Sequence, residues 1–483
     1  MDGTALCTLR DCTFAYSGEG TALHGVSLHV RAGELVMLVG PSGCGKTTVT
    51  RLINGLAPGH FTGTLTGHAC TGGLEAGRAP LESYARVVGS VFQNPKTQYF
   101  HARSTDELAF PCENAGMPAP QIRERVRQVA ARFGIADLLD RAIVNLSGGQ
   151  QQRLAVASAA VLEPAVMVLD EPTSNLDTAS MARLHGMIAA LKADGVAIVI
   201  AEHRLAWCAD LVDRYCVFDG GELLGAYTAR EFEALPATQR EAWGLRALDV
   251  SADRARIAEL ARAAHGEGAP VFGTRGLEVG YRKRALFRRG VEFSLRIPDV
   301  DVYGGQIVGI MGHNGAGKST FARTLCGLQV PLAGMVELGG EPASASALSR
   351  AAALVMQDVH YQLFAESVRA EVMLETVQDG GELAAAREQC DALLGELDLL
   401  DVADRHPMSL SGGQKQRLAI AVALMGKKRF VVLDEPTSGL DRAHMMQVGA
   451  LLRELAGRGV AVLVITHDDE LAAHWCDRIL ALD

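Results

Sequence analysis

Alternating apolar and polar residues open the chain, and continuous apolar runs follow them. The segments Ala5–Leu9 and Leu23–Val30 alternate, which is typical of strands in a small antiparallel sheet with one buried face. Leu35–Val39, Val166–Leu169 and Val196–Ile200 are apolar throughout, as expected of central strands in a parallel sheet covered by helices. This order of segments predicts an α/β fold with a small β subdomain.

Helical periodicity dominates a long stretch between these runs. Residues 104–145 are expected to form helices that break near Pro118 and Pro120, and so to make a helical subdomain inserted into the α/β core. Ser104 and Glu107 have the spacing of a capping box at its start. The Gly- and Thr-rich segment 59–79 is expected to be a surface loop.

Most of this pattern occurs twice. Matched residues lie 264 positions apart, and the clearest pairs are Ser147 and Ser411, Asp170 and Asp434, Glu171 and Glu435, and His203 and His467. A repeat of this size indicates two homologous domains, because solenoid repeats span only about 20–50 residues. We predict a first domain at 1–221, a helical linker or tail of that domain at 222–272, and a second domain at 273–483.

Composition and charge narrow the class of protein. The chain has 483 residues, a formal net charge of −10 and 48% hydrophobic residues, which fits a globular protein and disfavours a broad nucleic-acid surface. Its ten cysteines contain no C-x-x-C pair, so neither a zinc site nor a disulfide framework is indicated. The start lacks the pattern of a signal sequence, and no apolar run approaches the roughly 18 residues of a membrane span.

A glycine-rich turn, here called the phosphate turn, follows the first apolar run of each domain. It reads Gly40-Pro41-Ser42-Gly43-Cys44-Gly45-Lys46-Thr47 in the first domain and Gly312-His313-Asn314-Gly315-Ala316-Gly317-Lys318-Ser319 in the second. Both match G-x-x-x-x-G-K-[ST], in which backbone N–H groups surround phosphates, the lysine adds positive charge and the hydroxyl ligates Mg²⁺. The sequence therefore predicts two nucleotide sites.

A second glycine turn, the LSGGQ turn, precedes each Asp-Glu pair. It comprises residues 146–150 and 410–414, and in both copies the serine and glutamine have the spacing of a capping box. The two glycines between them cost helix stability, and the capping box does not explain them. The Asp-Glu pairs end apolar strands, at the edge of an open α/β sheet where ligands bind.

Taken together, the motifs resemble those of a known family. The phosphate turn, a glutamine segment, the LSGGQ turn, the Asp-Glu pair and a histidine occur twice in this order, so the chain resembles a tandem ABC-type ATPase over nearly everything outside 222–272. The resemblance implies two P-loop NTPase domains, each with a RecA-like core, a small antiparallel β subdomain and an inserted helical subdomain. It also implies two composite ATP sites, each between the phosphate turn of one domain and the LSGGQ turn of the other.

The resemblance implies roles for single residues, with ATP and Mg²⁺ as cofactors. Glu171 and Glu435 would be the general bases, and His203 and His467 would contact the γ-phosphate and position the attacking water. The residues expected to hold Mg²⁺ are Thr47, Gln93, Asp170, Ser319, Gln357 and Asp434. The residues expected to bind the nucleotide are Tyr16 and Tyr281, which would stack on adenine, together with Gly40, Pro41, Ser42, Gly43, Cys44, Gly45, Lys46, Thr47, Thr48, Gln93, Ser147, Gly148, Gly149, Gln150, Gly312, His313, Asn314, Gly315, Ala316, Gly317, Lys318, Ser319, Thr320, Gln357, Ser411, Gly412, Gly413 and Gln414.

The glutamine segment indicates a branch of this family. Residues 93–100, with the pattern Gln-Asn-Pro-x-x-Gln-x-Phe, look like those of energy-coupling factor importers for vitamins or metal ions, although the second copy has Asp358-Val359 in place of Asn-Pro. In that family this segment lines a groove for a transmembrane subunit, which implies Gln98, Phe100, Gln362 and Phe364 here. The expected partners are a transmembrane coupling subunit and a substrate-binding integral membrane subunit, at the cytoplasmic face of the cell membrane. Ordinary core packing of the two phenylalanines is the alternative.

A soluble ABC ATPase that acts on ribosomes, as in the F subfamily, is the competing interpretation. Such proteins typically carry Asn-His-Leu-Asp after the carboxylates, whereas this chain has Ser174-Asn175-Leu176-Asp177 and Ser438-Gly439-Leu440-Asp441. The basic cluster Arg282, Lys283, Arg284, Arg288 and Arg289 is expected to be a solvated loop rather than an RNA or lipid contact.

Overall fold

The computed structural model describes residues 5–18, 20–174, 176–263, 268–285, 288–357, 359–378 and 383–482, without the side chains of 283–292, 360 and 375–378. Asn175, Asp358 and most of the basic cluster's side chains therefore lie outside the described residues. The chain divides into two compact units, Met1–Asp249 with Gly439–Ala443 and Val250–Ser438 with His444–Asp483. Each unit is described by itself.

The core of the first unit is a six-stranded sheet of order β10-β9-β3-β8-β7-β6. Its strands are β3 (Leu35–Val39), β6 (Val88–Val91), β7 (Val166–Asp170), β8 (Ala197–Ala201), β9 (Arg214–Asp219) and β10 (Glu222–Thr228). All neighbours pair in parallel except β9 and β10, which are antiparallel. Every residue of β3 and β8 is buried, as their apolar runs predict.

An antiparallel sheet of order β2-β1-β4-β5 forms the β subdomain of this unit. Its strands are β1 (Ala5–Tyr16), β2 (Thr21–Arg31), β4 (Gly63–Thr71) and β5 (Leu74–Glu75). The expectation of a surface loop at 59–79 is therefore wrong for β4, because pairing with β1 gives this polar segment the hydrogen bonds of a strand. Gly67 lies at the register shift of that pairing with φ +86°, which explains a glycine inside the strand.

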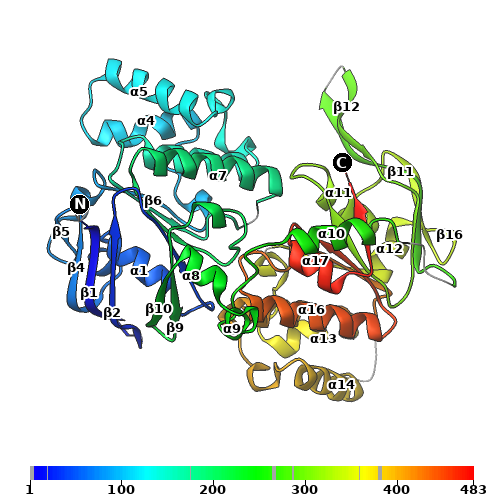
Figure 1. Cartoon of the computed structure of the whole chain (residues 1–483). Helices are drawn as coiled ribbons and strands as arrows, with labels where there is room; N and C mark the ends of the chain where they lie inside the picture. The colour runs from blue at the N-terminus through cyan, green and yellow to red at the C-terminus, as the bar shows by residue number, and fades with distance from the viewer. Residues whose placement is uncertain are drawn as a thin grey trace. The chain divides into compact units, whose positions relative to one another are not determined.

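Helices of the first unit flank the sheet and form the helical subdomain. They are α1 (Lys46–Ile53), α2 (Leu56–Gly59), α3 (Leu81–Tyr84), α4 (Ser104–Asn114), α5 (Ala119–Arg132), α6 (Gly148–Ala160), α7 (Thr178–Ala193), α8 (Ala229–Ala234) and α9 (Ala237–Ala242). Figure 1 shows α4 and α5 at one end of this unit and β1, β2 and β4 towards the other. The predicted break falls at Pro118, which is the residue before α5.

Two local expectations in this unit are corrected. Ser104 and Glu107 form no capping box, because the Ser104 hydroxyl donates to the carbonyl of Leu138 and the Glu107 carboxylate accepts from the backbone N–H groups of Phe100 and His101. The predicted helical stretch 222–272 begins instead as β10, which completes the main sheet of the first unit. A hairpin with β9 offers these residues backbone partners that composition does not reveal.

The second unit repeats the two sheets. The parallel sheet has the order β17-β18-β19-β14-β20, and the antiparallel sheet has the order β12-β11-β15-β16 with β13 also paired to β11. The strands are β11 (Phe272–Ala285), β12 (Arg288–Arg296), β13 (Val300–Val302), β14 (Ile307–Met311), β15 (Ala333–Leu338), β16 (Glu341–Pro342), β17 (Ala352–Val355), β18 (Phe430–Asp434), β19 (Ala461–Ile465) and β20 (Arg478–Ala481).

The helices of the second unit include one from the predicted linker. They are α10 (Ser251–Leu260), α11 (Lys318–Leu325), α12 (Ala345–Ala351), α13 (Val368–Gln378), α14 (Leu383–Glu396), α15 (Gly412–Met425), α16 (Arg442–Gly457) and α17 (Asp469–Trp475). Helix α10 packs against α17, where Arg254 pairs with Asp469 at 2.9 Å. Among the described residues no helix is long and apolar enough to cross a membrane.

Candidate functional site: two nucleotide sites

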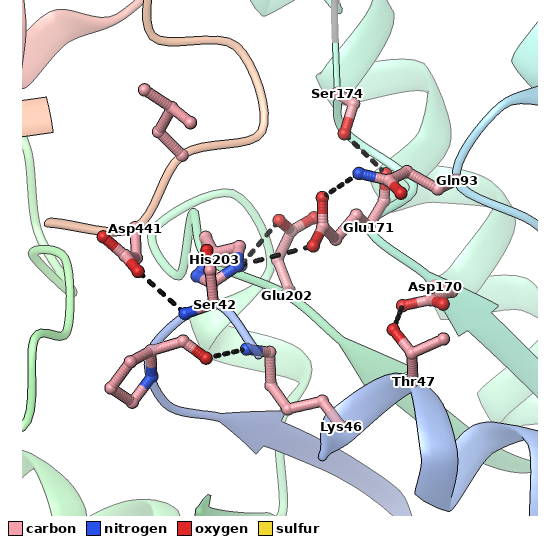
Figure 2. Close-up of polar contacts among 12 residues, drawn as sticks. Ser42, Lys46, Thr47, Gln93, Asp170, Glu171, Ser174, Glu202, His203 and Asp441 are labelled. Atoms are coloured by element: carbon pink, nitrogen blue, oxygen red, sulfur yellow. Dashed lines mark hydrogen bonds and ion pairs between the residues drawn. The ribbon is translucent and has the colours of Figure 1, made fainter. Parts of the chain in front are cut away.

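The first phosphate turn joins β3 to α1 through three glycines that need their lack of a side chain. Gly40, Gly43 and Gly45 have φ values of +147°, +79° and +102°, and a Cβ on Gly40 would lie 2.1 Å from the carbonyl oxygen of Phe218. The buried Lys46 ammonium donates to the carbonyl of Gly40 at 2.9 Å and to that of Pro41 at 2.9 Å, the second of which is drawn in Figure 2. The turn therefore presents a lysine and the free N–H groups of a helix N-terminus in one place.

Asp170 lies at the carboxyl end of β7, next to the start of α1. The hydroxyl of Thr47 donates to Asp170 Oδ1 at 3.2 Å. Burial raises the pKa of Asp170 to about 6, and the charge of Glu171 adds to the shift while the Thr47 hydrogen bond opposes it. A hydroxyl beside a carboxylate supplies oxygen donors, which Mg²⁺ prefers, so these residues fit the predicted ion.

Glu171, Gln93 and His203 meet beside this pair. Gln93 Nε2 donates to Glu171 Oε2 at 2.6 Å, and His203 Nε2 lies 3.4 Å from Glu171 Oε1 (Figure 2). His203 is buried, and its Nε2 makes no hydrogen bond of good geometry within the described part of the chain. Glu171 has φ +43°, a conformation that non-glycine residues rarely adopt and that is frequent at functional sites.

The second unit brings the matching residues together. Lys318 Nζ donates to the carbonyls of Gly312 and His313 at 2.7 and 3.0 Å, and the Ser319 hydroxyl donates to Asp434 Oδ2 at 2.8 Å. Burial also raises the pKa of Asp434, and the Ser319 hydrogen bond opposes the shift.

The predicted base and histidine of this unit are also adjacent. Glu435 has φ +50°, and its Oε1 lies 3.4 Å from His467 Nε2. The same imidazole nitrogen lies 3.0 Å from Lys318 Nζ and 2.9 Å from Asn314 Oδ1. Both units therefore hold lysine, hydroxyl, Asp, Glu and His groups at one sheet edge.

Both LSGGQ turns form the predicted capping boxes at the starts of α6 and α15. Ser147 and Gln150 bond reciprocally, as do Ser411 and Gln414. A Cβ on Gly149 would lie 2.1 Å from the Ser180 hydroxyl, so packing requires this glycine. A Cβ on Gly148 or Gly412 would have no neighbour within 4 Å among the described residues, and neither glycine has a positive φ, so neither packing nor backbone conformation requires glycine there.

The two tyrosines are placed alike. The Tyr16 hydroxyl lies 3.1 Å from Thr48 Oγ1 and accepts from Arg51 Nη1 at 2.9 Å. The Tyr281 hydroxyl accepts from Thr320 and Arg323, at 3.3 Å each. Each predicted adenine platform is thus tied to the helix that follows its phosphate turn.

Comparison with known proteins decides the family. The sequence profile described as ABC transporter matches residues 23–174 and 295–438, which together make up more than half of the chain. The chain belongs to the ABC transporter family. Its two matched segments make it a tandem ABC ATP-binding protein, an ATPase that binds ATP and Mg²⁺.

Relatives match this tandem ABC ATPase along its whole length. A "Putative ABC transporter ATP-binding protein" of Treponema denticola is 39% identical over 481 residues, covering 99% of this chain and 95% of that protein. The "Putative HMP/thiamine import ATP-binding protein YkoD" of Bacillus subtilis is 30% identical over 510 residues, covering 99% and 90%. A solved structure titled "RNase-L Inhibitor" has a TM-score of 0.63 at 22% identity, covering 98% and 87%, and shows a shared fold alone.

Sequence reasoning missed several residues that support the sites of this ABC ATPase. Arg51 and Arg323 hold the tyrosines, and their matched spacing after the phosphate turns was a usable signal. Glu202 accepts from the His203 N–H, and Asp468, next to His467, accepts from the Thr437 hydroxyl. The two carboxylates do not occupy matching sequence positions, because Glu202 precedes its histidine and Asp468 follows its own. Burial raises the pKa of Glu202.

Proposed function

We propose that each phosphate turn of this ATPase binds the phosphates of one ATP, with Lys46 and Lys318 as the charged contacts. Asp170 with Thr47, and Asp434 with Ser319, hold Mg²⁺, which neutralises phosphate charge when bound. Glu171 and Glu435 accept the proton of the attacking water, while His203 and His467 orient it. The closeness of these groups at one sheet edge in each unit supports the assignment.

We further propose that the ATPase drives a membrane importer of the energy-coupling factor type, for a vitamin or a metal ion. The observation that carries this proposal is the exposure of Phe100 and Phe364, whose surfaces are 76% and 78% exposed. The two occupy matching positions after the glutamine segments. Core packing does not account for them, whereas contact with a membrane subunit would bury them.

The backbone beneath each exposed ring is held in place. Glu107 accepts from the N–H groups of Phe100 and His101, at 2.9 Å each. In the second unit Glu371 accepts from Phe364 and Ala365 at 2.8 and 2.7 Å. Both carboxylates are buried, so each phenylalanine is presented from a fixed backbone rather than from a loose loop.

The two glutamines that were expected to line the groove hydrogen-bond to their own turns instead. Gln98 accepts from the Phe92 N–H and donates to the Ser90 carbonyl, and Gln362 accepts from the Met356 N–H at 2.7 Å. Because these amides bond their own turn, we assign them to shaping it. The membrane contact then rests on the phenylalanines.

The relatives favour transport over translation. ATP-binding proteins of ABC transporters act with membrane subunits, and the Bacillus subtilis relative is named for HMP and thiamine import. The ribosome-associated structural neighbours are only 22–23% identical, which is a likeness of fold. We therefore place this chain at the cytoplasmic face of the membrane, held there by a coupling subunit and a substrate-binding subunit.

The test is affinity purification of the tagged full chain from its own host in mild detergent, with transport assayed in parallel. We expect a polytopic membrane subunit to co-purify with the wild type, and much less of it with a Phe100→Ala/Phe364→Ala double variant that retains basal ATP hydrolysis. Leu224→Ala, a change at another exposed apolar side chain, is the matched control. Recovery of ribosomal proteins without a membrane subunit would overturn the importer proposal.

A further inference from the structure

A buried carboxylate supports the histidine of the first site. Glu202 is 3% exposed and lies directly before His203, at the end of β8. Its Oε1 accepts from the backbone N–H groups of His203 and Arg204 at 2.8 and 3.2 Å, and its Oε2 accepts from the Thr173 hydroxyl at 2.7 Å. Glu202 therefore joins the turn after the Asp-Glu pair to the turn that carries the histidine.

In the second unit, the carboxylate that contacts the matching threonine comes from the residue after the histidine rather than from the residue before it. Asp468 is 3% exposed and follows His467, and its Oδ2 accepts from the Thr437 hydroxyl at 2.8 Å. Its Oδ1 accepts from the Leu471 N–H and so caps α17. The threonines match in sequence, but the carboxylates do not: Thr466 stands where Glu202 would be.

The different positions of Glu202 and Asp468 go with different hydrogen bonds around the two proposed bases, Glu171 and Glu435. In the second unit the His467 N–H donates to Glu435 Oε2 at 3.3 Å. In the first unit Glu202 takes the His203 N–H, while Gln93 donates to Glu171. Arg204 also replaces the capping aspartate, and the residues that match α17 form a turn at 206–207 and a short 3-10 helix at Ala209–Leu211 instead of an α-helix.

We propose that Glu202 is the positioning residue of the first ATP site, that it takes the threonine contact which Asp468 makes in the second unit, and that it holds His203 and Glu171 in register. The proposal rests on the assignment of Glu171 and His203 to ATP hydrolysis. Removing Glu202 leaves two N–H groups and a hydroxyl without their buried acceptor, so the histidine turn shifts. A displacement of this kind slows chemistry more than it weakens binding of the nucleotide.

Steady-state hydrolysis of MgATP by the full chain tests the proposal. Glu202→Thr should lower log kcat by at least half as much as Glu171→Gln lowers it. The KM for MgATP should stay within about twofold of the wild-type value. Adding Arg204→Asp copies the second site, and we expect Glu202→Thr/Arg204→Asp to recover most of the lost kcat. Glu222→Thr, the same replacement at an exposed strand position, is the matched control.

Further variants distinguish a positioning role of Glu202 from a role in folding, and from an error in the assignment of Glu171 as the base. Thr173→Val, which removes only a hydroxyl from the same network, should lower kcat several-fold with little change in the thermal unfolding midpoint. The proposal is overturned if Glu202→Thr and Thr173→Val both keep wild-type kcat, or if the Arg204→Asp change restores the unfolding midpoint but not kcat. If Glu171→Gln itself loses no activity, the site assignment has failed rather than the role of Glu202.

Discussion

His203 and His467 occupy matching positions with different neighbours. His203 Nε2 lies 3.4 Å from Glu171 Oε1 and has no well-formed hydrogen bond among the described residues, whereas His467 Nε2 lies within 3.0 Å of both Lys318 and Asn314. Asn314 reaches the imidazole, and the matching residue of the first phosphate turn is the shorter Ser42. The groups that we propose to react are thus repeated, while the residues around them have diverged.

The largest effect is expected from the two proposed bases. Glu171→Gln and Glu435→Gln each remove a proton acceptor without changing its size, so hydrolysis at the altered site should fall by about 100-fold or more. Comparing kcat of the two single variants in the full chain measures how far the sites differ. Full activity in either variant would show that its site does not hydrolyse ATP, and equal losses would mean that the different histidine surroundings do not affect turnover.

The repeated chemistry could be predicted from sequence because it depends on fixed local spacing. The phosphate turns, the capping boxes at Ser147 and Ser411 and the apolar strands were all predicted and are all observed. These features form within a few residues, where periodicity and capping rules apply.

The missed features depend on residues far apart in the chain. Composition predicts a loop where β4 forms, because the strand is stabilised by pairing with β1, whose partners lie far away in the sequence, as Cys7 does from Thr71. The spacing of Ser104 and Glu107 predicts a capping box, but it does not reveal that the N–H groups of Phe100 and His101 use the Glu107 carboxylate as their acceptor. The exchange of Glu202 for Asp468 is visible only through the threonine that each contacts.

A smaller effect concerns the stability of the ligand-free chain. Between pH 3.8 and about 6, the folded chain holds a proton on Asp170 that the unfolded chain has lost, so its free energy of unfolding falls as pH rises. Asp170→Asn removes this penalty. Without Mg²⁺ and nucleotide we expect it to stabilise the first unit at pH 7.5 by about 3 kcal/mol, because the pKa is raised from 3.8 to about 6 and each pKa unit corresponds to about 1.4 kcal/mol. The gain should be smaller at pH 5.

Thermal unfolding of Asp170→Asn and Asp434→Asn would sharpen the comparison between the halves. The midpoint should rise by roughly 6–12 °C for Asp170→Asn at pH 7.5, and by less for Asp434→Asn. The difference is expected because the charge of Glu171 adds to burial in raising the pKa of Asp170, whereas burial alone raises the pKa of Asp434; a lysine and an arginine lower the pKa of both carboxylates. A larger rise for Asp434→Asn, or a rise at Asp170 that does not depend on pH, would contradict this electrostatic account.

The smallest effect concerns the link between the exposed phenylalanines and the LSGGQ helices. In the first half the Tyr99 hydroxyl donates to the carbonyl of Gln151 in α6, and Ser158 of α6 donates to the carbonyl of Glu107 at 3.2 Å. The matching residues of the second half are Leu363 and Val422, which have no hydroxyl. The backbone beneath Phe100 is therefore hydrogen-bonded to its LSGGQ helix by side chains that the second half lacks.

Tyr99→Phe should weaken this link by about 1 kcal/mol, the net value of one hydrogen bond. Amide hydrogen exchange of the full chain would report it as a roughly fivefold loss of protection in residues 98–103, with the matching residues 362–367 unchanged. Leu363→Met, which changes packing at the matching position without removing a hydroxyl, is the control. If hydrogen exchange at 98–103 is unaffected by Tyr99→Phe, packing alone stabilises this segment. The backbone at Phe100 and at Phe364 would then be equally stable, despite the different side chains beneath them.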